Sequence, residues 1–310
     1  MENLSDESSN VEQKLVDFAV SIAKEAGELT LSLFNDLNLE IIKKSDGSPV
    51  TEADRGAERL LRKRISDSFP EDSIIGEEEE NVLGSSGRTW ILDPIDGTQS
   101  FINGVPLFAN LVAFEDGNGS AVGVINLPAI DECVWAGRGL GCFADGKKAH
   151  VSNTETLDGC CVVTSGFDYW NSLSFFESLS RSKTTIRTWG DAYGYALVAT
   201  GRVDAMVDPI VNPWDVAPML TIIPLSQVIP ASGAASPSTK KSTNLLSRAS
   251  FALSISIRLP HAVATIGEIC PECGDIKIFA LLENIVVNFI ISSFSISGLY
   301  VTHTAPCSNE

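Results

Sequence analysis

An apolar segment that ends in two aspartates constrains this chain more than any other part of its sequence. The segment reads WILDPIDGTQSF over residues 90–101, so Asp93 and Asp96 stand three residues apart, directly before Gly97 and Thr98. A carboxylate at the end of a buried strand loses hydration, and buried charges are normally paired or bound to a cation. We therefore expect a buried strand whose final residues belong to a functional site.

Two further acids occupy comparable positions. Glu77 opens a run of four glutamates directly after the short apolar segment SIIG at 73–76, and Asp215 stands in NPWDVAPM, past a strand expected over 205–208. Two carboxylates about 4 Å apart repel by about 4 kcal/mol at an effective dielectric of about 20, so converging acids need a cation. Oxygen ligands favour Mg²⁺, Mn²⁺ or Ca²⁺. Two divalent ions would balance four carboxylates, as in two-metal phosphoester sites where an ion-held water is the nucleophile.

Each of these motifs has an ordinary interpretation when it is taken alone. An isolated Asp-x-x-Asp is usually a loop, GEEEE is more often a solvated acidic turn, and Asp215 alone is typical of a helix N-cap. Their occurrence together and in this order favours the metal site. If a helix begins at Gly97 and Thr98, their backbone N–H groups would point at a phosphate oxygen, with the helix dipole behind them.

Hydrophobic periodicity and turn signals predict both helices and strands along the chain. Apolar residues step by three and four from Val11 to Leu33, which predicts an amphipathic helix. Ser48-Pro49 is interpreted as a break, and Thr51 with Asp54 predicts the N-cap of a second helix that ends at Phe69-Pro70. A further helix is predicted over 191–200, and strands at 73–75, 89–92, 108–114, 121–127, 132–136, 141–143 and 205–208, with another αβ unit opening at 159–165.

We expect three regions along the chain. An N-terminal α/β metal-binding subdomain covers residues 1–155, the start of a second α/β subdomain covers 156–220, and an atypical tail covers 221–310. Of the 40 acidic and 22 basic residues, 35 and 17 lie among the first 220, whereas the tail holds 5 of each. The formal net charge of −18 therefore belongs to the first segment, and it argues against nucleic acid as a partner.

The cysteines and the N-terminus indicate the compartment. The seven cysteines are scattered without a disulfide framework, which favours a reducing environment. The opening MENLSDESSN lacks the pattern of a secretory signal or an organellar transit peptide. We expect a cytoplasmic protein with free thiols.

The tail has its own composition. A Ser/Ala/Pro-rich stretch at 230–242 is typical of a linker, and apolar runs follow at 251–259 and 276–301. The second run is long enough to span a bilayer, but Glu283, Asn284 and Asn288 lie within it, which disfavours a membrane anchor. The alternative is an irregular C-terminus. The single Cys-x-x-Cys pair at 270–273 is weak evidence for zinc.

The segments DPIDGTQSF (93–101), GEE (76–78), WDVA (214–217) and SPVTEAD (48–54) resemble those of the inositol monophosphatase-like family of Mg²⁺-dependent phosphatases, over residues from about 11 to 220. The resemblance implies a layered αβαβα sugar-phosphatase fold, two or three Mg²⁺ ions per site and a small-molecule phosphate monoester as substrate, and it is compatible with a homodimer. By resemblance, the metal ligands are Glu77, Asp93, the carbonyl of Ile95, Asp96 and Asp215. Thr98 paired with Glu77 would orient and deprotonate the attacking water, and Asp54 would serve a third, weaker metal.

Within the family, RTWGDAYGYALVATG at 187–201 resembles the histidinol-phosphate phosphatase branch more than the inositol branch. The carboxylate of Asp191 could pair with the ammonium of an amino-alcohol phosphate, a charge-assisted bond that a neutral polyol cannot offer. The alternative is an N-cap for the helix that follows, and the two roles can coexist. Substrate contacts are thus expected at Gly97, Thr98, Asp191 and Asp215.

The tail departs from the family pattern. After WDVA, family members continue into an apolar helix, an E-A-G-G turn, a strand and a closing α/β unit, whereas here Leu220 leads into TIIPLSQVIPASG. The predicted function is a Mg²⁺-dependent histidinol-phosphatase, a phosphoric monoester hydrolase of histidine biosynthesis. The alternatives are an inositol-1-monophosphatase or other sugar phosphatase, and a catalytically impaired Mg²⁺-binding relative that lacks the closing unit.

Other phosphatase chemistries fit the sequence less well. Haloacid-dehalogenase-type enzymes carry D-x-D-G-T, in which the two acids are two positions apart, whereas Asp93 and Asp96 are three positions apart. Cysteine phosphatases need an arginine six positions after the nucleophile, and Cys133 with Arg138 is one residue short. The three histidines lie outside every motif.

Overall fold

A computed structural model describes residues 10–36, 39–44, 47–154, 158–181 and 183–227, together with the backbone of three short strands between 264 and 291. The chain divides into two compact units, Met1–Ala262 and Val263–Glu310. The first unit contains all of the segments that resemble the phosphatase family. The division of this unit near residue 155 stays a prediction, although that position separates the two sheets described below.

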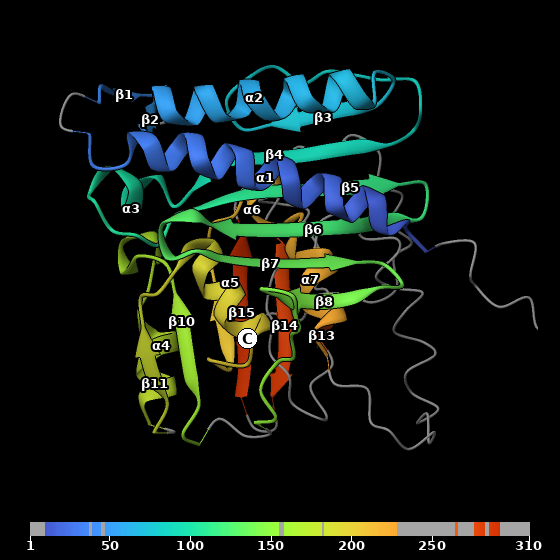
Figure 1. Cartoon of the computed structure of the whole chain (residues 1–310). Helices are drawn as coiled ribbons and strands as arrows, with labels where there is room; N and C mark the ends of the chain where they lie inside the picture. The colour runs from blue at the N-terminus through green and yellow to red at the C-terminus, as the bar shows by residue number, and fades with distance from the viewer. Residues whose placement is uncertain are drawn as a thin grey trace, which may run out of the picture. The chain divides into compact units, whose positions relative to one another are not determined.

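A seven-stranded sheet is the centre of the first unit (Figure 1). Its order follows the sequence from β3 to β9, with β3 parallel to β4 and all later neighbours antiparallel. Connections of two to four residues join the antiparallel strands from β5 to β9, as in hairpins, whereas α3 (Thr98–Ile102) lies in the longer connection from β4 to β5. The strands are β3 (Ser73–Gly76), β4 (Thr89–Asp96), β5 (Ala109–Asp116), β6 (Gly119–Leu127), β7 (Glu132–Gly137), β8 (Gly141–Ala144) and β9 (Lys147–Lys148).

Two long helices, α1 (Gln13–Leu33) and α2 (Glu52–Ser68), cover one face of this sheet (Figure 1). The face of α1 that meets the sheet is rich in small residues, and Gly27 lies so close to it that a Cβ there would stand 2.3 Å from Nδ2 of Asn126. Thr51 and Asp54 form the predicted capping box of α2. Both predicted helices are confirmed, with α1 beginning two residues after Val11.

Ser48-Pro49 separates the two helices, as expected, but the hairpin that contains it was not predicted. Residues on both sides of it form an antiparallel hairpin, β1 (Ile41–Lys43) with β2 (Pro49–Thr51). Pro49 is the first residue of its strand, a position where a missing backbone N–H is tolerated. The hairpin matters for the site because Lys44 directly follows β1.

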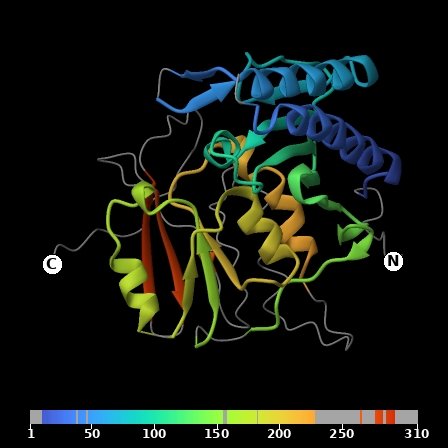
Figure 2. The ribbon, with the colours of Figure 1, turned by 60° about the vertical axis from the view of Figure 1, so that its left-hand side comes forward.

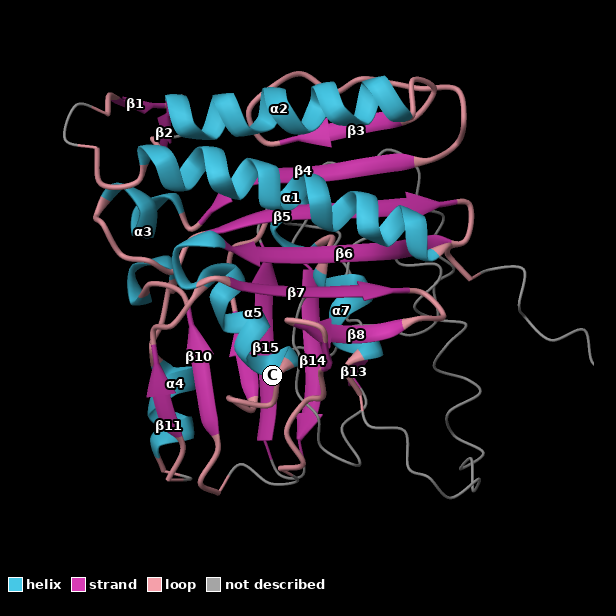
Figure 3. Cartoon of the chain, in the orientation of Figure 1, coloured by secondary structure: helices cyan, strands magenta, loops and turns pink. Residues whose placement is uncertain are grey.

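The opposite face of the large sheet carries α5 (Asp191–Ala199), α6 (Pro213–Val216) and α7 (Met219–Leu225). A three-stranded parallel sheet of order β11-β10-β12 packs on the far side of α5 (Figure 2). Its strands are β10 (Cys161–Thr164), β11 (Thr185–Arg187) and β12 (Ala205–Val207), and α4 (Ser174–Ser180) packs against β11. Figure 3 shows these helices and strands by type. The predicted αβαβα layering is confirmed.

Two apolar cores occupy the spaces between these layers. One lies between α1, α2 and the sheet around Trp90, and the other lies between the sheet, α5, α7 and the small sheet around Tyr195. The strands in between, β4 to β6, are buried on both faces over most of their length. The large sheet is therefore a rigid platform for residues at its edge.

In the second unit the structure describes an antiparallel sheet of β13 (Ala264–Thr265), β14 (Ile276–Leu282) and β15 (Ile285–Ile291). The described part of the apolar run 276–301 is thus a pair of strands. The predicted linker at 230–242, the run at 251–259 and the Cys-x-x-Cys pair lie outside the described residues. None of the helices that are described is long and apolar enough to cross a membrane.

Candidate active site

Parallel pairing brings the first two acidic segments to one edge of the large sheet. Gly76 at the end of β3 is in register with Leu92 in β4, so Glu77 and Asp93 follow at the same edge. β3 alternates between half-buried and buried positions, whereas β4 is buried from Trp90 to Ile95, so Asp93 is itself buried. The sequence pattern of an acid after an apolar strand therefore identifies two neighbours in space.

β4 continues further than expected. The strand was predicted to end at Leu92, but it extends to Asp96, with a shift of register between Asp93 and Asp96. Pro94 lies within this bulge, one of the few places in a sheet that accept proline. Its carbonyl accepts a hydrogen bond from Nδ2 of Asn110 at 2.7 Å. The bulge changes the direction of the end of the strand, so that the side chains of both aspartates lie in the site.

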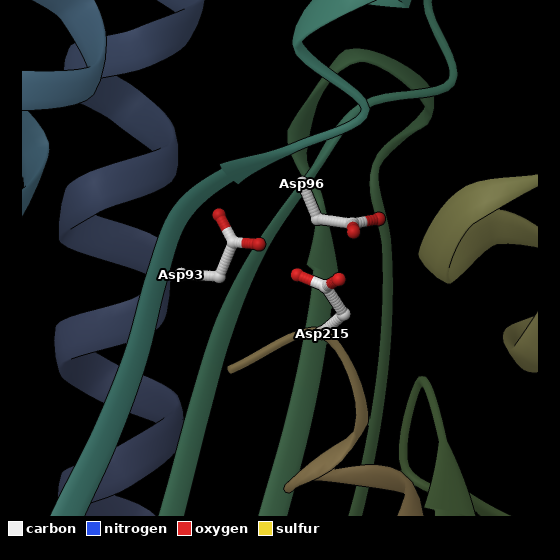
Figure 4. Close-up of side chains that lie close together, drawn as sticks. All are labelled: Asp93, Asp96 and Asp215. Carbon is white, nitrogen blue, oxygen red and sulfur yellow. The ribbon is translucent and has the colours of Figure 1, made fainter. Parts of the chain in front are cut away.

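Asp215 completes a cluster of three carboxylates. It lies in α6, which packs against β4 and β5, and one oxygen from each of Asp93, Asp96 and Asp215 lies within 4.8 Å of the other two. Figure 4 shows the three side chains turned toward one another. Asp215 is not the N-cap of α6 but its third residue, and it accepts the N–H of the N-cap residue Asn212 at 2.6 Å.

The cluster is electrostatically strained. Burial, followed by the charges of Glu77 and Asp96, raises the pKa of Asp93 well above its ordinary value. Burial and the charge of Asp191 likewise raise the pKa of Asp96, although the N–H of Ala192 donates to its Oδ2. Burial also raises the pKa of Asp215 to about 7. All three carboxylates thus lack a compensating charge from the described protein groups.

This donor set fits a hard divalent cation. Its members are all carboxylate oxygens, the ligands that Mg²⁺ and Mn²⁺ prefer, and they converge from two separate segments. A cation among them would remove the mutual repulsion that raises their pKa values. Among the residues that the structure describes, neither a thiol nor an imidazole takes part in the cluster, so its chemistry disfavours zinc.

Glu77 lies beside the cluster with its carboxylate paired to a lysine. Nζ of Lys44 is 2.7 Å from Oε1 of Glu77 and 2.5 Å from Oε1 of Glu78. Although burial lowers it, these ion pairs raise the pKa of Lys44 above its ordinary value. GEEEE is therefore only partly a solvated turn, because the first two glutamates face inward and the last two are more exposed.

Asp54 is buried at the start of α2 next to Glu77. Its Oδ2 accepts hydrogen bonds from the backbone N–H and the hydroxyl of Thr51, at 2.7 and 2.6 Å. Among the described residues its Oδ1 is buried without a hydrogen-bond partner. Burial raises the pKa of Asp54 to about 6, against the effect of these hydrogen bonds. The free oxygen leaves Asp54 able to serve a ligand, and its metal role stays a prediction.

A short helix, α3 (Thr98–Ile102), begins directly after the aspartates, as expected. Its N-cap is Gly97, whose φ of 79° lies in the left-handed region that glycine adopts freely. The hydroxyl of Thr98 donates to the carbonyl of Ile95 at 3.1 Å. The predicted pairing of Thr98 with Glu77 and the predicted ligation of a metal by the Ile95 carbonyl stay predictions.

Asp191 lies close to Gly97 and to Asp96 of the aspartate cluster. A Cβ placed on Gly97 would be 3.1 Å from Oδ2 of Asp191, and the charge of Asp191 acts on Asp96. The interpretation of Asp191 as an N-cap is wrong, because Gly190 is the N-cap of α5 and Asp191 is the first helical residue, with a φ of 56°. Its side chain is instead held by Ser165, whose hydroxyl donates to Oδ1 at 3.3 Å.

The sequence reasoning missed Asp208. The hydroxyl of Ser165 also lies 3.1 Å from Oδ2 of Asp208, and Oδ1 of Asp208 is buried without a partner among the described residues. Burial, followed by the charge of Asp191, raises the pKa of Asp208 to about 7. Tyr169 faces the same acids, which together with burial raise the pKa of its phenol. Asp208 directly follows β12, so the acid-after-strand pattern could have identified it.

Comparison with known proteins gives the same assignment as the motifs. The sequence profile of the inositol monophosphatase family matches residues 11–224. The histidinol-phosphatase of Chlorobaculum parvum is 42% identical over 211 residues, which are 67% of this chain and 82% of that protein. The fructose-1,6-bisphosphatase/inositol-1-monophosphatase of Thermotoga maritima is 30% identical over 262 residues, which are 84% of this chain and 98% of that protein.

Solved structures share the fold. An IMPase of Thermotoga maritima matches with a TM-score of 0.64 at 30% identity, over 69% of this chain and 84% of that one. An IMPase/NADP phosphatase complexed with Mg²⁺ and phosphate matches with a TM-score of 0.62 over 69% of this chain and 82% of that one, but its 20% identity supports the fold alone. From motifs, profile and fold, the chain belongs to the inositol monophosphatase family, a family of metal-dependent phosphatases.

Proposed function

We propose that this chain is a Mg²⁺-dependent phosphomonoesterase whose substrate is histidinol phosphate. The observation that carries the proposal is the second pair of acids, Asp191 and Asp208, whose charges act on Asp96 of the aspartate cluster. Bridged by Ser165, they add negative charge beyond what the metal ligands supply. That charge does not strengthen the binding of an anionic phosphate alone, whereas it strengthens the binding of a substrate that also carries an ammonium group.

The residues that would hold Mg²⁺ are Asp93, Asp96 and Asp215, with Glu77 at the edge of the cluster and Asp54 as a more distant ligand. When bound, Mg²⁺ would supply positive charge to the phosphate oxygens and lower the pKa of water at the site. We propose two or three ions per site, because the acids from Glu77 to Asp215 carry more negative charge than one ion balances.

The protein residues do the positioning. The backbone N–H groups of Gly97 and Thr98 open α3 at the cluster and would donate to a phosphate oxygen. The hydroxyl of Thr98, within reach of the Ile95 carbonyl, would orient the attacking water and pass its proton toward Glu77. Asp191 would accept hydrogen bonds from the substrate ammonium, on the leaving-group side.

The relatives support this choice of substrate and also provide the second candidate. A 42% identical relative is a histidinol-phosphatase, and Asp191 lies in the segment that resembles that branch. A 30% identical relative is a fructose-1,6-bisphosphatase/inositol-1-monophosphatase, which supports an inositol or sugar phosphate as the alternative substrate. A catalytically impaired relative is the remaining alternative, because the family's closing unit is not recognisable after Leu220.

A phosphate-release assay separates these functions. Histidinol phosphate, inositol-1-phosphate and β-glycerophosphate are compared, each with Mg²⁺ and with a chelator. We expect Mg²⁺-dependent turnover with the highest kcat/KM for histidinol phosphate. Asp191→Asn is expected to raise KM for histidinol phosphate about 10- to 100-fold, the range for losing a charged hydrogen bond, while changing KM for inositol-1-phosphate much less.

Asp168→Asn is the matched control, since it removes the same charge from an exposed position on the neighbouring 3-10 helix, Phe167–Tyr169. Equal losses for both phosphates in Asp191→Asn would contradict the proposed ammonium contact. Higher kcat/KM for inositol-1-phosphate would favour the alternative substrate. Metal binding without turnover of any of the three would favour the impaired relative.

A further inference from the structure

A buried ion pair on α2 lies directly beneath the segment that carries Glu77. Glu58 is fully buried and Arg62 nearly so, and Nε of Arg62 donates to Oε1 of Glu58 at 2.7 Å. Burying a charged pair is costly unless its remaining hydrogen-bonding groups find partners. The partners of this pair therefore indicate what it does.

Both groups bind the backbone of the acidic segment. The N–H of Glu78 donates to Oε2 of Glu58 at 2.7 Å, and the N–H of Glu79 donates to Oε1 at 3.1 Å. Nη2 of Arg62 donates to the carbonyl of Glu79 at 2.9 Å. A carboxylate beneath four glutamates would otherwise be repelled by them, so its contacts with the peptide N–H groups and with Arg62 explain why it is tolerated there.

Gly76 makes this close approach feasible. A Cβ on Gly76 would stand 2.2 Å from Oε1 of Glu58 and 2.8 Å from Nη2 of Arg62, closer than atoms can come. The residue before Glu77 and the two after it are thus all fixed against the same ion pair. Glu77 has little freedom to change the direction of its side chain by moving its backbone.

We propose that Glu58, supported by Arg62, is a positioning residue that holds Glu77 in the orientation required for metal binding. This inference rests on the proposed Mg²⁺-dependent function. Groups that orient a metal ligand typically change metal affinity by 10- to 100-fold when they are mutated. The pair does not touch substrate or metal, so its effect is transmitted through the backbone of Glu77–Glu79.

The test is Mg²⁺ binding to Glu58→Gln, measured by isothermal titration calorimetry, with thermal unfolding and phosphate release on the same samples. We expect affinity for Mg²⁺ to fall 10- to 100-fold, and kcat to recover at saturating Mg²⁺. Gly76→Ala, which displaces Glu58 by contact, is expected to reproduce this loss. It keeps the inference testable even if Glu58→Gln does not fold.

Asp72→Asn is the matched control. Asp72 is another buried carboxylate paired with an arginine, 2.8 Å from Arg88, but it lies at the start of β3, away from the acids. We expect this variant to lose stability while its Mg²⁺ affinity stays within twofold of wild type. Affinity unchanged in Glu58→Gln and Gly76→Ala, or lowered equally in Asp72→Asn, would overturn the inference while wild-type turnover still supported the proposed function. A wild-type chain that binds no Mg²⁺ would overturn both.

Discussion

Replacing one acid of the cluster with its amide should make the metal-free protein more stable. In Asp215→Asn the side chain keeps an oxygen that can accept the N–H of Asn212, so the capping box of α6 is retained. What disappears is a negative charge within 4.8 Å of two other carboxylates. We therefore expect a gain of stability from a substitution at a proposed metal ligand.

Two calculations give a similar magnitude for the gain in the free energy of unfolding, one from the repulsion between charges and one from the raised pKa. At 4.8 Å and an effective dielectric of about 20, one pair of charges repels by about 3.5 kcal/mol. Burial and the neighbouring charges also raise the pKa of Asp215 from 3.8 to about 7, and about three pKa units correspond to about 4 kcal/mol. Above pH 7 the folded protein carries the full penalty, which Asp215→Asn removes.

The sign of the pH dependence follows from linkage. Because the folded-state pKa of Asp215 is raised, the folded state binds more protons than the unfolded state between about pH 4 and pH 7. The free energy of unfolding of the metal-free wild type therefore falls as pH rises through that window. In Asp215→Asn this contribution is absent, so the gain is large at pH 8 and vanishes near pH 4.

Urea denaturation in the presence of a chelator, at pH 4, 6 and 8, measures this gain. Asp204→Asn is the control, because we expect it to lower the stability at neutral pH where Asp215→Asn raises it. Burial alone would raise the pKa of Asp204, but hydrogen bonds from Thr154, Cys161 and Ser152 outweigh it and lower the pKa, so this carboxylate stabilises the fold at neutral pH and loses that effect as pH falls. Asp215→Asn that is equally stable or less stable than wild type at pH 8, without metal, would refute the reasoning.

Three further predictions test other parts of the account. Asp93→Asn is expected to lower Mg²⁺-dependent kcat by about 10²- to 10³-fold, the scale for losing one charge-stabilising group, and near-wild-type turnover would exclude Asp93 from the site. Lys44→Met frees the carboxylates of Glu77 and Glu78 for a metal ion, so the Mg²⁺ concentration for half-maximal activity should fall a few-fold. A rise in that concentration would mean that Lys44 holds the two carboxylates in the positions that metal binding requires. Gly27→Ala should lower the free energy of unfolding by about 1–3 kcal/mol, because its Cβ would meet Asn126. Gly56→Ala, whose Cβ meets only Leu29 at 3.5 Å, should raise the free energy of unfolding by about 0.5–1 kcal/mol. Equal effects of the two substitutions in urea denaturation would contradict the close packing of α1.

Most of the fold prediction rests on local sequence patterns, namely helix-capping residues and the spacing of apolar residues. The capping box at Thr51 and the three- and four-residue spacing from Val11 are decided by contacts within a helix, so they can be recognised without the tertiary structure. The β1–β2 hairpin could not be recognised, because Pro49 is tolerated only through its place at the start of a strand. Likewise, the extension of β4 through Asp93 depends on a bulge against β5.

The candidate site likewise contains residues that sequence patterns identify and residues that only the tertiary structure identifies. Asp93, Asp96 and Asp215 were identified from strand ends and motifs, and the structure brings them together. Lys44 was missed because its importance comes from Glu77, which lies far along the chain. Asp208 follows β12 as the other acids follow their strands, but its contact with Ser165 is visible only in the structure. The role proposed for Glu58 depends on backbone hydrogen bonds to residues about 20 positions later, which no spacing rule describes.

The account's central claim is that the carboxylates of Asp93, Asp96 and Asp215 form a divalent metal site. Anomalous diffraction from crystals soaked in Mn²⁺ tests it most directly, because Mn²⁺ scatters anomalously and shares the oxygen preference of Mg²⁺. We expect at least one anomalous peak among these carboxylates, with oxygen ligands at roughly 2.0–2.2 Å. Crystals in saturating Mn²⁺ with no peak between the three side chains would contradict the claim.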